Sequence, residues 1–259
     1  MAAGYRLLLA RALPRLAGRD DRSSQALATA IRTTALGRFP AEERAWIERI
    51  EAARARIPTS AIEVGATVGD GPRRPVGEHL EEASQACLWM SLPPALGRFL
   101  TRLVRELAPD SALELGTGFG ISTSYQLAAL DLNGSGRMTS LDVEDMVAIA
   151  RPGLERLGFG DRVVLVGGRI EDTLAGAVAA ATPIDYALLD ADHTEAGTLS
   201  AFDAILPHLA PGAVVVLDDI NWTEGMRRAW SAIPGRPGVA ATVTVHRLGI
   251  AVIADRSEA

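Results

Sequence analysis

Two acidic clusters in the second half of the sequence combine residue types that are suited to chemistry. Asp190, Asp192 and His193 follow one apolar run, and Asp218 and Asp219 follow another. Carboxylates that lie close together repel one another, and a divalent cation removes this conflict. Because carboxylate oxygens select hard ions, we expect Asp190, Asp218 and Asp219 to hold Mg²⁺ or another divalent cation.

A simpler interpretation of the same residues is helix capping. Asp192 or Asn221 would satisfy the first N–H groups of the helix that follows it. Asn221 is also an alternative to Asp219 as a metal ligand, in a shifted register. Both alternatives remain open from the sequence.

The absence of lysine narrows the choice of a proton acceptor. All 26 basic residues are arginine, which stays protonated at ordinary pH. His193 stands beside the acids, and an unperturbed imidazole titrates near neutral pH. We therefore predict His193 as the general base and expect His208 and His246, the latter in a strand, to be structural.

A glycine-rich turn earlier in the chain is suited to binding a nucleotide-like cofactor. The stretch 114–120 carries glycines at every second position, which permit a tight turn and close approach of a ligand. The next helix points its N-terminus at that ligand, where Ser122 would add a hydroxyl donor. Asp142, at the end of the next strand, is placed to accept hydrogen bonds from ribose hydroxyls.

Two cofactor classes fit such a turn, NAD and S-adenosylmethionine (SAM). A dinucleotide fingerprint needs G-x-G-x-x-G, but position 121 is isoleucine. A lysine-free chain also lacks the Tyr-x-x-x-Lys pair of many NAD enzymes. The spacing therefore favours SAM, and an NAD-dependent oxidoreductase and a purely structural turn stay open as alternatives.

Alternating apolar strands and helices must position these residues. We expect strands over 111–115, 137–143, 163–166, 184–189 and 213–217, and helices over 121–130, 144–157, 170–181, 194–209 and 223–233. Continuous apolar strands are typical of a parallel sheet covered on both faces. The predicted fold class is α/β, with a doubly wound, mostly parallel, seven-stranded, Rossmann-like sheet. It should end in an antiparallel hairpin, 239–247 and 250–254, with a turn at Leu248-Gly249.

The first hundred residues predict an N-terminal helical extension. Helices are expected over 41–56, 78–90 and 94–107, with a short strand at 62–64. We divide the chain into a helical cap or oligomerisation region, 1–108, and a SAM-binding domain, 109–259. A homodimer through the N-terminal helices is expected.

Composition limits the function classes. A net charge of -6 argues against nucleic-acid binding. The apolar run near the N-terminus is too short for a membrane span. The single cysteine, Cys87, excludes an intrachain disulfide and is expected to be packed in the interior of a cytoplasmic protein.

The stretch from Ser111 to Trp222 resembles the class I, cation-dependent O-methyltransferases, the group that includes catechol and caffeoyl-CoA O-methyltransferases. The resemblance rests on the Glu-Leu-Gly turn, the acid at 142, the Gly167-Gly168-Arg169 segment and the two acidic clusters. It implies a SAM site formed by Glu114, Gly116, Thr117, Gly118, Gly120, Ser122, Asp142, Val143, Gly168, Arg169 and Asp190. It also implies a metal held by Asp190, Asp218 and Asp219.

Two departures from that family stand out. The family's asparagine ligand is Asp219 here, which adds a negative charge, and its catalytic lysine falls on His193. This pattern is more similar to bacterial macrolide-sugar O-methyltransferases, and the arginine- and alanine-rich composition is similar to that of a high-GC bacterium. The resemblance implies methyl transfer to a hydroxyl of a small molecule, such as a sugar, polyketide or phenolic natural product.

Two other functions stay open. The acids would bind a cationic acceptor in a metal-independent N-methyltransferase, and a SAM-binding scaffold would use the helical extension for partners. Candidates for the acceptor pocket, for which a surface or core position is equally compatible, are Arg73, Arg74, His79, Trp89 and Trp222.

Overall fold

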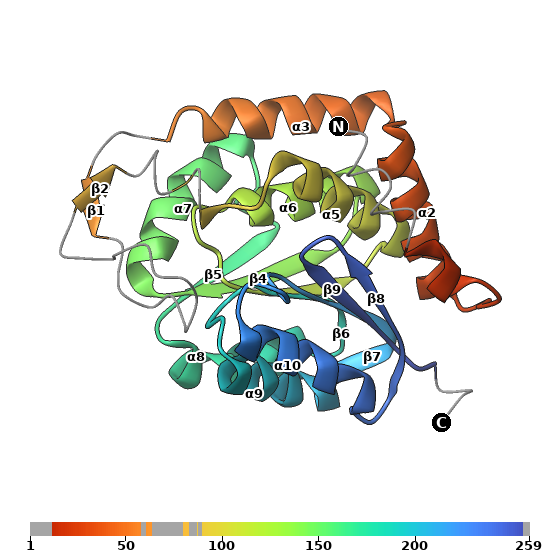
Figure 1. Cartoon of the computed structure of the whole chain (residues 1–259). Helices are drawn as coiled ribbons and strands as arrows, with labels where there is room; N and C mark the ends of the chain where they lie inside the picture. The colour runs from red at the N-terminus through yellow and green to blue at the C-terminus, as the bar shows by residue number, and fades with distance from the viewer. Residues whose placement is uncertain (1–11, 58–60, 64–79, 83–86, 88–89, 256–259) are drawn as a thin grey trace.

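A seven-stranded sheet forms the centre of the molecule and carries helices on both faces (Figure 1). The structure, a computed structural model, describes residues 12–57, 61–63, 80–82, 87 and 90–255. The strands of the sheet are β3 (Ser111–Leu115), β4 (Arg137–Asp142), β5 (Val163–Gly167), β6 (Ile184–Leu189), β7 (Leu209–Leu217), β8 (Val239–Val245) and β9 (Leu248–Ile253). Their order is β5-β4-β3-β6-β7-β9-β8, and β9 runs antiparallel to both of its neighbours, β7 and β8. This confirms the predicted fold class.

Two helical layers enclose the sheet. One contains α5, α6 and α7 with α2 and α3 packed near them, and the other contains α8, α9 and α10 (Figure 1). The helix bounds are α2 (Arg22–Leu36), α3 (Ala41–Arg54), α5 (Pro94–Leu107), α6 (Ile121–Asn133), α7 (Glu144–Leu157), α8 (Ile170–Ala181), α9 (Glu195–Ile205) and α10 (Glu224–Ala232). Among the described residues, no helix combines the length and the apolar character needed to cross a membrane.

The central strands are apolar on both sides because both faces are covered. On β6, Tyr186 and Leu188 join the buried cluster of the α5–α7 layer. Ala187 and Leu189 join the cluster of the α8–α10 layer. Successive side chains of a strand point to opposite faces, so a strand buried on both sides loses the polar alternation of a half-exposed one.

The N-terminal helices share a core with the half of the chain that forms the sheet. Leu27 and Ile31 of α2 and Ile50 of α3 are fully buried in the same cluster as the residues of α5 and α6. The Tyr125 hydroxyl of α6 donates a 2.6 Å hydrogen bond to Glu51 of α3. The division of the chain at residue 108 remains a prediction, but these helices pack into the body of the molecule.

The topological switch of the sheet determines where a ligand can bind. Within the sheet, the path begins at the central strand β3 and runs outward through β4 and β5. It then returns to β6, which lies on the other side of β3. In open parallel sheets, ligands occupy the crevice outside the carboxyl ends of the strands at such a point. The ends of β3, β4, β5, β6 and β7 carry the predicted site residues.

Two predicted elements differ in the structure. The helix expected over 78–90 is wrong at Leu80–Glu82, which forms strand β2 and pairs antiparallel with β1 (Ala61–Glu63). The helix expected to reach residue 209 ends at Ile205, because Pro207 lacks the N–H that would continue it and a 3-10 turn follows.

The hairpin turn also lies two residues earlier than predicted. The turn is His246-Arg247, which moves His246 out of its expected strand to a φ of 58°. Gly249 instead lies inside β9 opposite Leu217. A Cβ at this glycine would overlap the Trp230 ring, so glycine serves close packing there rather than a turn.

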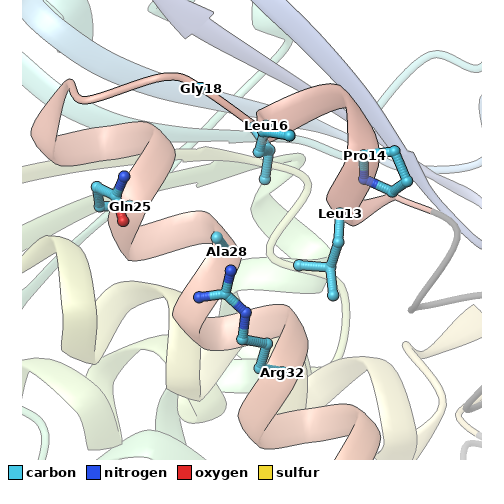
Figure 2. A pocket seen from close by; sticks show the side chains of 8 residues that line it. Leu13, Pro14, Leu16, Gly18, Gln25, Ala28 and Arg32 are labelled. Atoms are coloured by element: carbon cyan, nitrogen blue, oxygen red, sulfur yellow. The ribbon is translucent and has the colours of Figure 1, made fainter.

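A hollow of about 400 Å³ lies between α2 and the short 3-10 helix η1 (Leu13–Leu16) (Figure 2). Leu13 and Leu16 face Ala28 and Arg32 across it (Figure 2). None of the predicted site residues lines this hollow.

Candidate active site

The glycine-rich turn after β3 packs against the segment that follows β6. A Cβ at Gly116, where φ is 100°, would overlap the carbonyl oxygen of Asp190, so only glycine fits. The Thr117 hydroxyl hydrogen-bonds inward to Ser140 at 2.6 Å. Gly118 has a φ of 51° and no atom within 4 Å of an added Cβ. The open side of the turn is therefore at Gly118, and Gly120 then caps α6 with a φ of 74°.

Glu114 faces the interior of the turn. One carboxylate oxygen accepts hydrogen bonds from Ser122 (2.8 Å) and Gln126 (2.7 Å), and the other from Thr123 and Ser140 (both 2.6 Å). Burial raises the pKa of Glu114, and these four donors oppose that rise. All four acceptor positions of the carboxylate are thus occupied by the chain itself. The Ser122 hydroxyl is one of these donors, and the prediction that Glu114 and Ser122 contact the cofactor stays a prediction.

Asp142 connects the glycine turn with the end of β4. Its carboxylate accepts from the N–H groups of Gly118 and Val143, both at 2.7 Å. Burial raises the pKa of Asp142, and these two bonds lower it. Val143 keeps 45% of its side chain exposed beside this acid. Gly168 donates to the Asp142 carbonyl at 2.9 Å, and Arg169 follows it with an exposed side chain.

Three of the predicted polar residues meet at the ends of β6 and β7. Asp190, His193 and Asp219 have potential ligand atoms within 4.8 Å of one another. His193 Nε2 lies 3.7 Å from Asp190 Oδ1, and its ring meets Trp222 edge-on with 5.0 Å between centroids. The structure therefore brings together the predicted base, one residue of each acidic cluster and a candidate acceptor residue.

Asp218 has a partner that the sequence did not reveal. Its two carboxylate oxygens accept from the Nε and Nη2 of Arg247 at 2.7 and 2.5 Å, and its side chain is fully buried. Arg247 Nε also lies 3.2 Å from Asp219 Oδ1. The sequence predicts the hairpin turn two residues too late, so it does not bring Arg247 to the acids.

Burial and like charges determine the electrostatics of this cluster. Burial and the neighbouring Asp218 raise the pKa of Asp190 well above its ordinary value. The same two causes raise the pKa of Asp219 to about 6, against the effect of Arg247. Burial lowers the pKa of His193, so its imidazole is neutral at pH 7. A neutral imidazole can accept a proton or bind a metal.

The N-caps of the two helices that follow the acidic clusters are threonines, not Asp192 or Asn221. Thr194 is the N-cap of α9 and Thr223 is the N-cap of α10, each through its hydroxyl. Asn221 is exposed, and its main-chain carbonyl accepts from Arg227. Helix capping therefore leaves the acids at positions 190, 218 and 219 unexplained.

The remaining candidates divide into two groups. His208 shares a 3.0 Å hydrogen bond with Thr182 near the other end of β6, away from the acidic cluster. Cys87 is buried beside Ser91, as expected for a packed cysteine. The acceptor-pocket candidates Arg73, Arg74, His79 and Trp89 lie outside the described residues.

Comparison with known proteins agrees with this geometry. Residues 113–220 match the methyltransferase domain family. Catechol O-methyltransferase of Niastella koreensis is 32% identical over 172 residues, which cover 60% of this chain and 75% of the relative. Its counterpart in Mycobacterium tuberculosis is 30% identical, over 59% and 74% of the two chains.

The chain belongs to the class I SAM-dependent O-methyltransferases of the cation-dependent type. The fold of this O-methyltransferase is also that of an O-methyltransferase from Bacillus cereus solved in complex with S-adenosylhomocysteine (SAH). The TM-score is 0.58 at 21% identity, covering 87% of this chain and 97% of the other. The aligned domain contains the glycine turn, Asp142 and both acidic clusters.

Proposed function

We propose that this O-methyltransferase moves the methyl group of SAM to a hydroxyl of a small molecule and that His193 is the general base. The observation that carries this proposal is the position of His193. It is a partly buried, neutral imidazole at the carboxyl end of β6, beside Asp190, whose main chain contacts the glycine turn. A base at this place is within the crevice where the cofactor of such a sheet binds.

The SAM site in this proposal lies along the ends of β3, β4 and β5. Asp142 would accept the ribose hydroxyls, because two N–H donors use only part of its capacity. The exposed Val143 side chain offers an apolar face for adenine, with Gly168 and Arg169 along the rim. The methionine part would lie over the open face of Gly118.

The acceptor would lie beside His193 and Trp222, whose rings meet edge-on. A hydroxyl held there would give its proton to the imidazole. The acceptor oxygen bonds to the methyl carbon, the carbon–sulfur bond breaks and SAH leaves. Most of the rate then comes from orienting the two reactants.

A divalent cation fits the acidic groups that surround this place. Asp190 and Asp219 offer carboxylate oxygens within 4.8 Å of each other, and Asp218 keeps one acceptor position on the oxygen that receives only Arg247 Nη2. Oxygen ligands of this kind suit Mg²⁺. When bound there, the ion would supply Lewis acidity that lowers the pKa of the acceptor hydroxyl.

The finer features of the proposal follow from the sequence resemblance. The acceptor would be a sugar, polyketide or phenolic natural product in the cytoplasm of a bacterium. The protein would act as a homodimer through its N-terminal helices. Each of these remains a prediction.

Calorimetric titration with SAH tests the cofactor site. We expect micromolar binding that Asp142→Asn weakens at least tenfold. Equal binding of SAH by the variant and the parent would reject the assigned ribose site.

A panel of hydroxyl and amine acceptors, assayed with Mg²⁺ and with EDTA, tests the reaction. Methylated hydroxyls that disappear with EDTA are expected. Methylated amines that survive EDTA would instead support the N-methyltransferase alternative.

A further inference from the structure

Arg247 is the residue that the tertiary structure adds to the acidic cluster. We propose that its guanidinium compensates the extra carboxylate of Asp219 and holds Asp218, so that the cluster keeps the charge that a divalent cation requires. This inference rests on the proposed function, because it concerns the same site. Arg247 is a positioning residue in this role: it acts through the acids and does not touch the acceptor.

Strand register brings Arg247 to the cluster. Leu217 on β7 pairs with Gly249 on β9. Because the two strands are antiparallel, the position two residues beyond Leu217 lies opposite the position two residues before Gly249. These positions are Asp219 and Arg247. The Ile220 N–H also donates to the Arg247 carbonyl at 3.1 Å, which attaches the hairpin turn to the segment that follows β7.

The side-chain geometry is that of a strong ion pair. Two guanidinium nitrogens meet the two oxygens of Asp218 at 2.7 and 2.5 Å, and Nε lies 3.2 Å from Asp219. Only 21% of the Arg247 side chain is exposed. A planar guanidinium can bind a carboxylate through both oxygens, which a lysine ammonium cannot do. Asp218 therefore has a fixed orientation before any ligand arrives.

The formal charges explain why an arginine belongs here. A cluster with a formal charge of about -2 is the one that a single divalent ion neutralises. Asp219 in place of asparagine makes the three positions -3, and the nearby Arg247 returns the cluster to -2. The positive charge of Arg247 thus offsets the negative charge that Asp219 adds to the cluster.

A double-mutant cycle on Mn²⁺ binding tests this compensation. Mn²⁺ affinity is measured by electron paramagnetic resonance with SAH present, for the parent, Asp219→Asn, Arg247→Gln and the double variant. Asp219→Asn alone should weaken Mn²⁺ binding at least tenfold, because it leaves the cluster at -1. Adding Arg247→Gln to Asp219→Asn should restore the affinity to within about threefold of the parent.

The variant Arg247→Lys tests whether the charge of Arg247 or its bidentate geometry is what matters for Mn²⁺ binding. It keeps the positive charge and loses the bidentate contact, so alone it should leave Mn²⁺ affinity within about threefold of the parent. Combined with Asp219→Asn it should stay as weak as Asp219→Asn. This pair also keeps the test decisive if Arg247→Gln does not fold. The matched control is the exposed Arg236–Asp203 pair, also bidentate at 2.7 and 2.9 Å. Changing both of its members to Gln and Asn should leave Mn²⁺ affinity unchanged.

Three results would overturn the proposal: a parent protein that does not bind Mn²⁺, an Asp219→Asn variant with undiminished affinity, or a double variant as weak as the single one. Calorimetry with SAH on the same samples keeps this outcome separate from the proposed function. Loss of SAH binding by the parent would reject the cofactor site, whatever the Mn²⁺ cycle shows.

Discussion

At the scale of single residues, His193 has two roles open to it. It lies near Asp190 and edge-on to Trp222, and burial lowers the pKa of its imidazole. The neutral ring therefore suits either proton acceptance or metal binding, and its distance to Asp190 is compatible with both. The two roles have different consequences when the ring is removed.

Replacing His193 by alanine should lower turnover about 10²- to 10⁴-fold, the usual contribution of a general base. Mn²⁺ and SAH affinities should each stay within about threefold, because the proposal gives His193 no ligand role. The measurements are steady-state turnover with the acceptor found in the panel and Mn²⁺ titration. His208→Ala, at the far end of the strand, is the control. A tenfold loss of Mn²⁺ affinity would make His193 a metal ligand instead.

At the scale of elements, helix α2 shows how one carboxylate stabilises a helix end. Asp21 is the N-cap, and its side chain accepts the Ser24 N–H at 2.8 Å. Burial raises the pKa of Asp21, but the hydrogen bonds from Ser24 and the charge of Arg19 outweigh it, so the net shift is downward. A depressed pKa in the folded state means that ionised Asp21 stabilises the fold.

Asp21→Ala should lower the free energy of unfolding by about 1 kcal/mol at pH 7, the usual cost of a lost N-cap. The stabilisation by Asp21 is fully present above the unfolded pKa of 3.8 and is lost as pH falls through the lower folded value. The difference between the two proteins should therefore shrink below pH 4 in urea unfolding curves. Asp21→Asn keeps the cap and should show a smaller loss at pH 7. A constant difference down to pH 2 would contradict this.

The turn between β3 and α6 is the element that we expect to bind the cofactor. Gly118 and Gly134 both have positive φ, 51° and 74°, and neither has an atom within 4 Å of an added Cβ. They differ in place, since Gly134 ends α6 and Gly118 faces the crevice. Alanine at either position therefore imposes similar backbone strain. Only at Gly118 would the added methyl group also obstruct a ligand in the crevice.

Gly118→Ala and Gly134→Ala should each cost about 1–2 kcal/mol of stability, the strain of a left-handed alanine. Only Gly118→Ala should weaken SAH binding, by at least tenfold in calorimetry, because its methyl group would occupy the ligand's side of the turn. Equal SAH affinities of the two variants would place the cofactor elsewhere.

At the scale of the whole molecule, one core joins the N-terminal helices to the sheet. Leu27, Ile31 and Ile50 are buried with the α5–α7 layer, and the hydrogen bond from Tyr125 to Glu51 spans α6 and α3. Removing α2 and α3 would expose apolar side chains of α5 and α6, the helices that cover one face of the sheet. The predicted boundary at residue 108 therefore separates segments of sequence that share buried contacts.

Calorimetric unfolding should show a single cooperative transition. The calorimetric enthalpy should equal the van't Hoff enthalpy, because the shared core couples the N-terminal helices to the sheet. SAH at one hundred times its Kd should stabilise the protein by about 2.7 kcal/mol and shift that one transition as a unit. Two transitions, of which SAH moves only one, would show independent domains.

The sequence by itself determined the strand and helix alternation, the glycine turn, Asp142 and the two acidic clusters. These are local signals: apolar runs specify buried strands, glycines mark positive φ, and parallel strands place their carboxyl ends at one edge. The sequence also shows that His193 follows the first acidic cluster and that the chain resembles a known family. It shows that Asp219 adds a negative charge, but not which residue balances that charge.

Only the tertiary structure decided which groups are already satisfied. Glu114 is enclosed by four donors that come from β4 and from three positions on α6. Gly249 is glycine because Trp230 packs against it inside β9, and not because it forms the turn. The turn therefore lies two residues earlier than predicted and contains Arg247. Such contacts join residues distant in the chain, and periodicity along the sequence carries no information about them. The partner of Asp218 lies 29 residues further along the chain and meets it only because β9 pairs with β7 in one particular register.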